Sequence, residues 1–138
     1  MRRLVVLALL ASACQPVVSS VEPSHQPRMV RSASLLGTWE LLSVDDIAVP
    51  SKRVSVTFGS DGRFTAKVDC NTARGTYSFS SAELSFHGWE VTEMGCVPPL
   101  PQEALIGEAL RGDGYAVAFT NSSELHLSGP HRLVLRRL

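Results

Sequence analysis

Short segments in which apolar and polar residues alternate, separated by turn residues, most constrain the fold of this 138-residue chain. Every second residue is apolar in 54–58 and in 64–68, and residues 59–62 between them are Gly, Ser, Asp and Gly. A period of two places successive side chains on opposite faces of a strand, and a short turn of such residues joins two strands into a hairpin. Residues 75–79 and 83–86 predict a second hairpin by the same criteria.

A single segment has helical spacing instead. Within Pro101–Arg111 apolar residues recur four positions apart, which places them on one face of a helix. A proline at its start and Gly112 just past its end are typical helix boundaries. Residues 87–100, which contain two glycines and two prolines, are expected to form a long loop before this helix.

The remaining strand-like segments complete a domain over residues 35–138. They lie at 37–41, 115–120, 125–127 and 132–136. About eight short strands and one helix predict a mainly β fold, an antiparallel sheet that closes into a small barrel because closure removes exposed strand edges. Four aromatic residues at equivalent positions on these strands are expected to fill the interior: Trp39, Phe58, Phe64 and Tyr77.

The N-terminus has the order of a secretory signal peptide. Two arginines after Met1 precede an apolar run, Leu4–Ala11, which is far too short to span a membrane; two small residues and Cys14 follow. The end of the segment resembles the lipobox of bacterial lipoproteins, in which the cysteine is acylated after cleavage. We therefore expect residues 1–13 to be removed and Cys14 to carry a lipid anchor in the membrane. The alternative is an ordinary secretory signal.

Residues 14–34 are expected to form a flexible tether between the lipid and the domain, because they contain prolines and serines but no aromatic residue. Gln15 after the cysteine, instead of Asp, implies sorting to the outer membrane in Gram-negative lipoproteins, so the expected location is the cell envelope, facing the periplasm. The whole chain has 13 basic and 13 acidic residues. This balance excludes a strongly basic nucleic-acid binder, and we expect a monomer.

Several motifs occur in a characteristic order. They are Gly37–Leu41, Gly62–Phe64, Cys70–Asn71, Gly75–Tyr77, Thr92–Cys96 in the pattern Thr-x-Met-x-Cys, and Leu125–Leu127. Together they resemble the META/HslJ domain family of small bacterial envelope proteins. Asp69 stands where that family commonly has a glycine before the cysteine. The resemblance implies a lipocalin-like antiparallel barrel with a helix, an association with envelope stress, and no established enzymatic activity.

Two cysteines remain once Cys14 is acylated. An even pair in an exported chain predicts a disulfide between Cys70 and Cys96. Closing a loop of about 27 residues would stabilise the fold by about 3.5 kcal/mol on the chain-entropy estimate. Free structural thiols are the alternative. A metal site would need two further ligands, so we expect no metal and no other cofactor.

The disulfide would hold two polar stretches together on the barrel. Asn71, Arg74, Thr92 and Met94 then form a possible interaction patch on a rigid scaffold. In the alternative interpretation Asn71 only supplies a left-handed turn conformation, while Thr92 and Met94 pack against the domain.

Other polar residues predict no catalytic site. The histidines are expected on the surface or in the tether, and no Gly-x-Ser-x-Gly motif accompanies them; they are His25, His87, His126 and His131. Asp45 and Asp46 lack the spaced oxygen ligands of a calcium loop. Arg132, Arg136 and Arg137 either contact anionic lipid or form a solvated strand end.

These observations favour a non-enzymatic envelope lipoprotein that binds or supports an envelope protein, in a role associated with stress. One alternative is a lipocalin-type binder with a small apolar ligand inside the barrel, although the expected aromatic core leaves little room for it. A barrel that inhibits a secreted protease is a further alternative.

Overall fold

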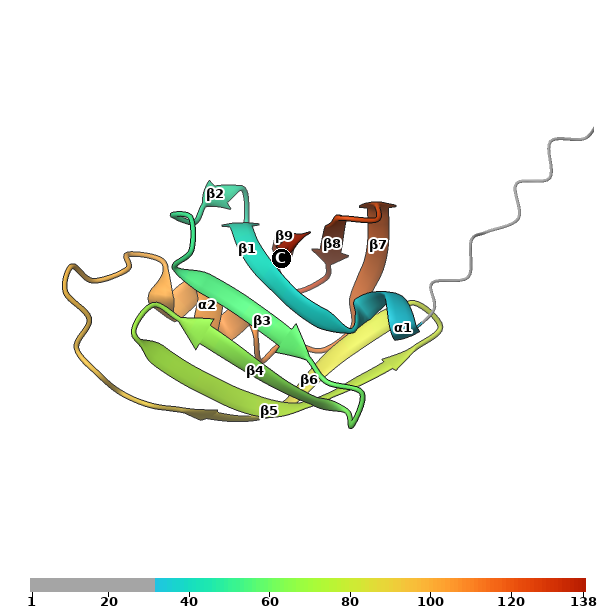
Figure 1. Cartoon of the computed structure of the whole chain (residues 1–138), viewed down its shortest axis with the longest axis horizontal. Helices are drawn as coiled ribbons and strands as arrows, with labels where there is room; N and C mark the ends of the chain where they lie inside the picture. The colour runs from blue at the N-terminus through green and yellow to red at the C-terminus, as the bar shows by residue number, and fades with distance from the viewer. Residues whose placement is uncertain (1–31) are drawn as a thin grey trace, which may run out of the picture.

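Both predicted hairpins form, and the chain continues the same antiparallel meander around a barrel (Figure 1). The computed structural model describes residues 32–138, so the predicted signal peptide, Cys14 and His25 lie outside the described residues. The elements in order are α1 (Ser32–Leu35), β1 (Gly37–Val44), β2 (Ile47–Ala48), β3 (Val54–Phe58), β4 (Arg63–Val68), β5 (Asn71–Ser80), β6 (Glu83–Val91), α2 (Glu103–Ala109), β7 (Tyr115–Asn121), β8 (Glu124–Ser128) and β9 (Arg132–Arg137).

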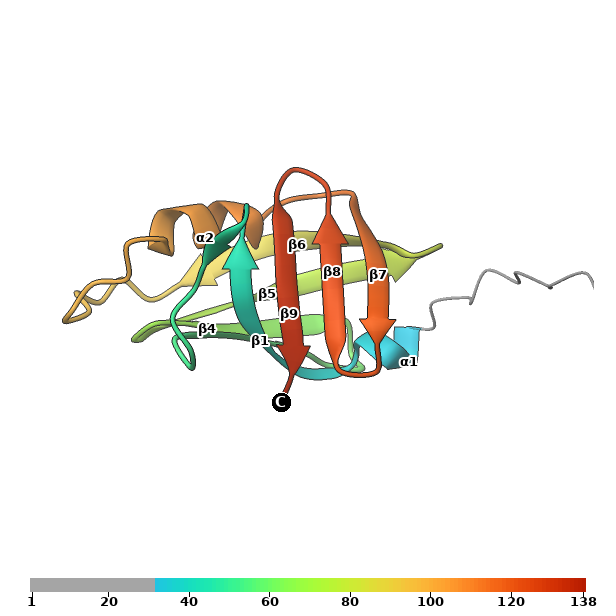
Figure 2. The same cartoon turned by 90° about the horizontal axis from the view of Figure 1, so that it is seen from above.

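Eight of these strands close into an antiparallel barrel. Each strand from β3 to β9 pairs with its neighbour in sequence, and β1 pairs with both β3 and β9, which closes the sheet. The two-residue strand β2 pairs with β1 and adds a short extension outside the barrel. The expected mainly β barrel is therefore present, with β7, β8 and β9 beside β1 on one side (Figure 2).

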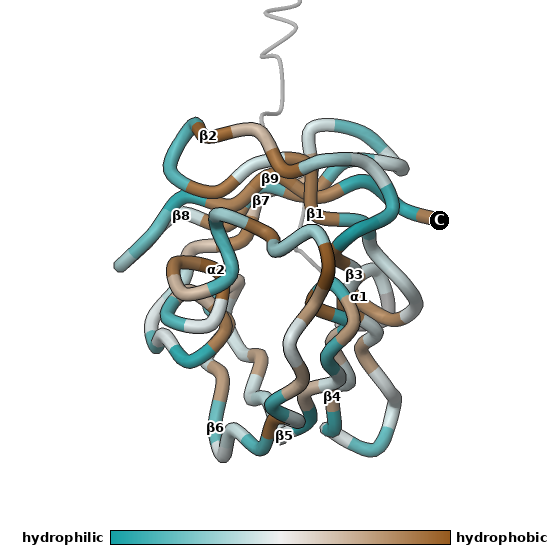
Figure 3. The backbone as a smooth tube through the Cα atoms, turned by 90° about the vertical axis from the view of Figure 1, so that its left-hand side faces the viewer, coloured by the Kyte–Doolittle hydropathy of each residue, from teal (hydrophilic) through white to brown (hydrophobic). Residues whose placement is uncertain are grey.

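The weakest join in the barrel lies between β6 and β7. The two strands pair only at Glu83 with Ala116 and at Leu84 with Tyr115. Helix α2 occurs in the connection between them and buries Ile106 and Ala109 in the core. Figure 3 shows α2 between β6 and the side of the barrel formed by β7–β9. The helix thus covers the place where the strands diverge.

Three of the four predicted core aromatics are fully buried, namely Trp39, Phe58 and Phe64. Tyr77 is only partly buried: its ring packs edge-on against Phe58, and its hydroxyl donates to the Gly59 carbonyl at 2.6 Å. This hydroxyl needs a polar partner, which explains why Tyr77 stays at the margin of the core. Phe86 and Tyr115, which the sequence reading did not place inside, are also buried.

Two predicted boundaries were wrong. Strand β6 continues to Val91, so His87 lies in a strand and the loop before α2 is shorter than the expected 87–100. A bulge interrupts the β5–β6 register here, with Gly88 at a φ of +59°, and it breaks the alternation that marks a strand. The helix covers Glu103–Ala109 only, because residues 101–102 form a turn and Leu110 is the C-cap.

The two ends of the described chain support each other. Leu35 of α1 is fully buried, and its carbonyl accepts a hydrogen bond from Trp39 Nε1 at 2.8 Å. The guanidinium of Arg137 lies 4.2 Å from the centre of the Trp39 ring and donates to the Ser34 and Leu36 carbonyls. The domain therefore includes residues slightly before the expected start at position 35. Neither helix within residues 32–138 has the length and apolar character needed to cross a membrane.

Candidate functional site

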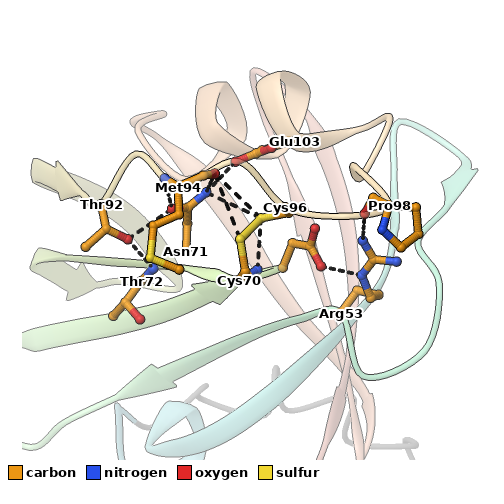
Figure 4. Close-up of a disulfide and its surroundings, with 10 residues drawn as sticks. Arg53, Cys70, Asn71, Thr72, Thr92, Met94, Cys96, Pro98 and Glu103 are labelled. Carbon is orange, nitrogen blue, oxygen red and sulfur yellow. Dashed lines mark hydrogen bonds and ion pairs between the residues drawn. A yellow bond between two sulfur atoms is a disulfide. The ribbon is translucent and has the colours of Figure 1, made fainter.

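The predicted disulfide joins the β4–β5 turn to the loop between β6 and α2. Cys70 lies in the turn just before β5 and Cys96 in the loop of residues 92–102, with their Cα atoms 5.6 Å apart (Figure 4). The bond closes a segment of 26 residues in sequence separation. It holds the loop against one end of the barrel.

Asn71 is the second connection between the barrel and this loop. Its side chain is buried, and its Oδ1 accepts hydrogen bonds from Met94 N at 2.7 Å and Thr92 Oγ1 at 3.1 Å. Its Nδ2 donates to the Met94 carbonyl at 3.1 Å and to Glu103 Oε1 at 2.9 Å. The amide group thus joins β5, the loop and the start of α2 in one network (Figure 4). Asn71 positions the loop and is not itself available to a partner.

Thr92 extends the strand pairing into the loop. Its backbone N–H donates to the Thr72 carbonyl at 3.0 Å, and its Oγ1 accepts from Thr72 N at 3.0 Å. The same hydroxyl donates to Asn71, so one side chain satisfies two neighbouring groups. The interpretation in which Asn71 provides a left-handed turn is wrong, because Asn71 is the first residue of β5.

Asp69 takes the left-handed conformation instead, with a φ of 58°. Aspartate tolerates this conformation better than most residues, which explains why Asp69 can replace the glycine that is common at this position in the family. Its Oδ1 accepts a hydrogen bond from Arg53 Nε at 2.5 Å, and this contact lowers the pKa of the Asp69 carboxyl. Arg53 also donates to the Pro98 carbonyl at 2.9 Å. Asp69 therefore links the turn to the far part of the same loop.

Three of the side chains that remain exposed on this junction are apolar, and they lie beside the exposed Glu93. Met94 is 55 % exposed and Val97 is 95 % exposed, while Val91 at the end of β6 is 39 % exposed. An open groove of about 660 Å³ lies between the loop and α2; Trp89 and Met94 contribute to its wall together with the charged Glu93 and Arg111. Such a tethered, solvent-exposed apolar surface can take part in binding.

The predicted patch is thus only partly assembled. Asn71, Thr92 and Met94 come together, but Arg74 lies on the outward face of β5, opposite Glu90, beside a separate hollow. Sequence reasoning missed Val97 and Arg53. The signal for Val97 was an apolar residue directly before two prolines in a loop, a position from which a side chain cannot easily reach the core.

The predicted surface histidines form contacts within the barrel. Each histidine in residues 32–138 lies near a carboxylate: His126 near Glu124 at 2.6 Å, His131 near Asp45 at 2.8 Å and His87 near Asp113 at 3.9 Å. The hydrogen bond from His131 lowers the pKa of Asp45. These pairs support turns and strand ends.

The closing arginines are also engaged internally. Arg132 pairs with Asp46 at 2.8 Å, and Arg136 pairs with the buried Glu40 at 2.7 Å. Glu40 additionally accepts from Ser51 and from the Lys52 backbone, which fastens the β2–β3 connection to the barrel wall. Arg136, Lys52 and Ser51 together lower the pKa of Glu40 to about 2. The arginines are thus neither a purely solvated strand end nor a free basic cluster.

A closed eight-stranded antiparallel barrel with one covering helix defines a small lipocalin-like barrel protein. The chain belongs to the META domain family, whose profile matches residues 33–138. No curated protein matches the chain in sequence.

Solved structures share this fold. A protein from Burkholderia xenovorans, determined by NMR, is 22% identical with a TM-score of 0.63, covering 97% of this chain and 99% of its own. A second NMR structure is 25% identical with a TM-score of 0.59, over 74% of this chain and 89% of its own. A lipocalin-like protein from Bacteroides uniformis is 19% identical with a TM-score of 0.50, over 76% and 99%.

Proposed function

We propose that this protein is a non-enzymatic, lipid-anchored barrel of the cell envelope that binds another envelope protein through the apolar loop beside the disulfide. The observation that carries the proposal is the placement of this loop. Helix α1, from which the chain leads back to the predicted tether and Cys14, lies at one end of the molecule, and the loop lies at the opposite end (Figures 1 and 2). A barrel anchored through residues 14–34 would present the loop away from its own membrane attachment.

The exposed apolar residues support a protein partner. Met94 and Val97 occur in the loop, Val91 leads into it, and Ile47 on β2 is 48 % exposed. Gln102 donates to the Ala48 carbonyl at 3.1 Å, which brings β2 next to the end of the loop. Burying such side chains against a partner is favourable at about 25 cal/mol per Å² of apolar surface.

The way the loop is held also supports binding. The disulfide, Asn71 and Arg53 attach it at three points, so little conformational freedom is left to lose when a partner binds. The association with envelope stress that the family resemblance implies fits a role of this kind, in which the barrel supports another envelope component. In contrast, the buried core aromatics occupy the barrel interior, so the structure favours no ligand inside it.

The test is site-specific crosslinking in the native envelope. A photoreactive residue placed at Met94, in the same loop as Val97, should capture a defined protein, whereas the same residue at Thr57, exposed on the outward face of β3, should not. Val97→Asp should remove the captured protein without changing the amount of folded barrel. Equal capture from both positions, or capture that Val97→Asp leaves unchanged, would contradict the proposal.

A further inference from the structure

We propose that the reduced form of this protein binds one thiophilic divalent cation, such as Zn²⁺ or Cd²⁺, through the thiolates of Cys70 and Cys96 and the carboxylate of Asp69. The two cysteines are joined as a disulfide in the structure, so the site belongs to the reduced chain alone. It would be a second property of the same junction, independent of the proposed protein partner.

The ligand atoms are already close together. One carboxylate oxygen of Asp69 and the two sulfur atoms all lie within 4.8 Å of one another. Around a tetrahedral zinc ion with bonds of about 2.0–2.3 Å, neighbouring ligand atoms lie roughly 3.5–3.8 Å apart. Once the S–S bond is broken, small movements of the two cysteine side chains would bring the three atoms to this spacing.

Asp69 has a free oxygen for a cation. Its side chain is only 10% exposed, Oδ1 is held by Arg53, and Oδ2 is buried with no hydrogen-bond partner in the part of the chain that the structure describes. A buried acceptor without a partner is costly, and a bound cation would satisfy it. Arg53 would then orient the ligating carboxylate, as outer-shell partners commonly do in metal sites.

A fourth ligand and the charge balance are also available. The Met94 carbonyl oxygen lies 3.9 Å from Cys70 Sγ and 3.8 Å from Cys96 Sγ, so it or a water can complete a tetrahedral set. Two thiolates and one carboxylate carry three negative charges, which a divalent cation and the Arg53 guanidinium together neutralise. Soft thiolates select Zn²⁺ or Cd²⁺ over the hard cations Mg²⁺ and Ca²⁺.

The redox step needs a two-electron reductant. A dithiol transfers two electrons and two protons to the Cys70–Cys96 disulfide and becomes a disulfide itself, whereas a phosphine with one water molecule becomes a phosphine oxide; either one leaves two thiols on the protein. Binding of the cation then displaces both thiol protons as the two metal–sulfur bonds form. An oxidising disulfide that accepts two electrons from the thiolates and two protons from water would re-form the Cys70–Cys96 bond and release the cation.

The experiment uses the full chain with Cys14→Ser in mild detergent, so that only the two thiols of interest are present. Cd²⁺ is titrated into protein reduced by a phosphine, and binding is followed by the ultraviolet thiolate-to-cadmium absorption band. We expect one Cd²⁺ per reduced chain, no band for the oxidised chain, and a rise in the melting temperature of the reduced chain when Cd²⁺ is added.

The decisive variant is Asp69→Asn, because asparagine also tolerates the left-handed conformation but carries no charge. Its affinity for Cd²⁺ should fall by about tenfold or more, while the control Asp61→Asn in the exposed β3–β4 turn should bind like the unchanged chain. No binding by the reduced chain would overturn the proposal. The proposal would also be overturned if reduced Asp69→Asn bound Cd²⁺ as tightly as the unchanged reduced chain. That result would mean that the two thiolates bind the ion without Asp69, as in an unfolded chain or a simple dithiol.

Discussion

Asn71 and Met94 are joined by two hydrogen bonds of opposite direction, from Met94 N to Asn71 Oδ1 at 2.7 Å and from Asn71 Nδ2 to the Met94 carbonyl at 3.1 Å. The side-chain amide of Asn71 therefore pairs with the Met94 backbone as the backbone of a neighbouring strand would. It satisfies both backbone groups of a loop residue whose own side chain points to solvent. The loop therefore keeps a defined position even though its Met94 and Val97 side chains contribute little to the core.

Asn71→Ala should lower the free energy of unfolding by about 1–3 kcal/mol, because it leaves Met94 N and the Thr92 hydroxyl without a buried partner. Denaturant unfolding measures the loss. Thr72→Ala is the matched control, since Thr72 is exposed and contacts Thr92 only through its backbone N–H and carbonyl. Similar losses for both variants would mean that the amide network is not what holds the loop.

Reduction of the disulfide, or the double change Cys70→Ser/Cys96→Ser, should lower stability by about 3.5 kcal/mol on the chain-entropy estimate. Residues 92–102 should exchange amide hydrogen faster before the strands do, because the remaining hydrogen bonds of the loop are fewer than those of the sheet. Thiol titration of the denatured, unreduced protein from its native compartment should find no free thiol at these positions. Two free thiols would contradict the disulfide.

Acid should destabilise the protein partly through Glu40. Its folded pKa of about 2 lies below the usual value of 4.5, because of its hydrogen bonds to Arg136, Lys52 and Ser51. The unfolded chain therefore binds more protons between these values, so the stabilisation present above pH 4.5 is lost as the pH falls toward 2. The stability profile of Glu40→Gln should be flatter over this range than that of the unchanged protein. Parallel profiles would show that Glu40 does not contribute.

Phe64→Ala should cost about 3–5 kcal/mol, because the ring is buried and packs against Phe86 with centroids 5.1 Å apart. Thermal or denaturant unfolding measures the effect. Thr65→Ala, one residue along on the outward face of β4, is the control and should change stability by less than about 0.5 kcal/mol. A loss below about 1 kcal/mol for Phe64→Ala would be inconsistent with its central place in the core.

Cys14→Ser should abolish membrane association and labelling with radioactive palmitate, while leaving the barrel folded. The reason is that the charged, apolar and small residues before Cys14 place this cysteine where bacterial lipoproteins are acylated. Cell fractionation and circular dichroism give the two readouts. If the native chain takes up no palmitate, the anchor proposal fails and the protein is simply secreted.

The hairpins, the helix and the barrel class could all be read from local pattern. Residues 54–58 and 64–68 show the period of two without interruption, and both pack one face inward. Strand β6 beyond Phe86 could not be read in this way, because a bulge at Gly88 disturbs the alternation and pairing with β5 compensates for it. The cysteine pairing followed from counting alone, once Cys14 was assigned to the lipid.

The sequence by itself thus determined the class of fold, the cysteine pair and the expected anchor, since these depend on neighbouring residues or on residue counts. Only the tertiary structure decided that Asn71 is an internal connector, that Glu40 is buried beside Arg136, and that Arg74 lies apart from Met94. The physical reason is distance along the chain. Glu40 and Arg136 are 96 residues apart, and their contact exists only because β1 and β9 close the barrel in one register, which no local pattern encodes.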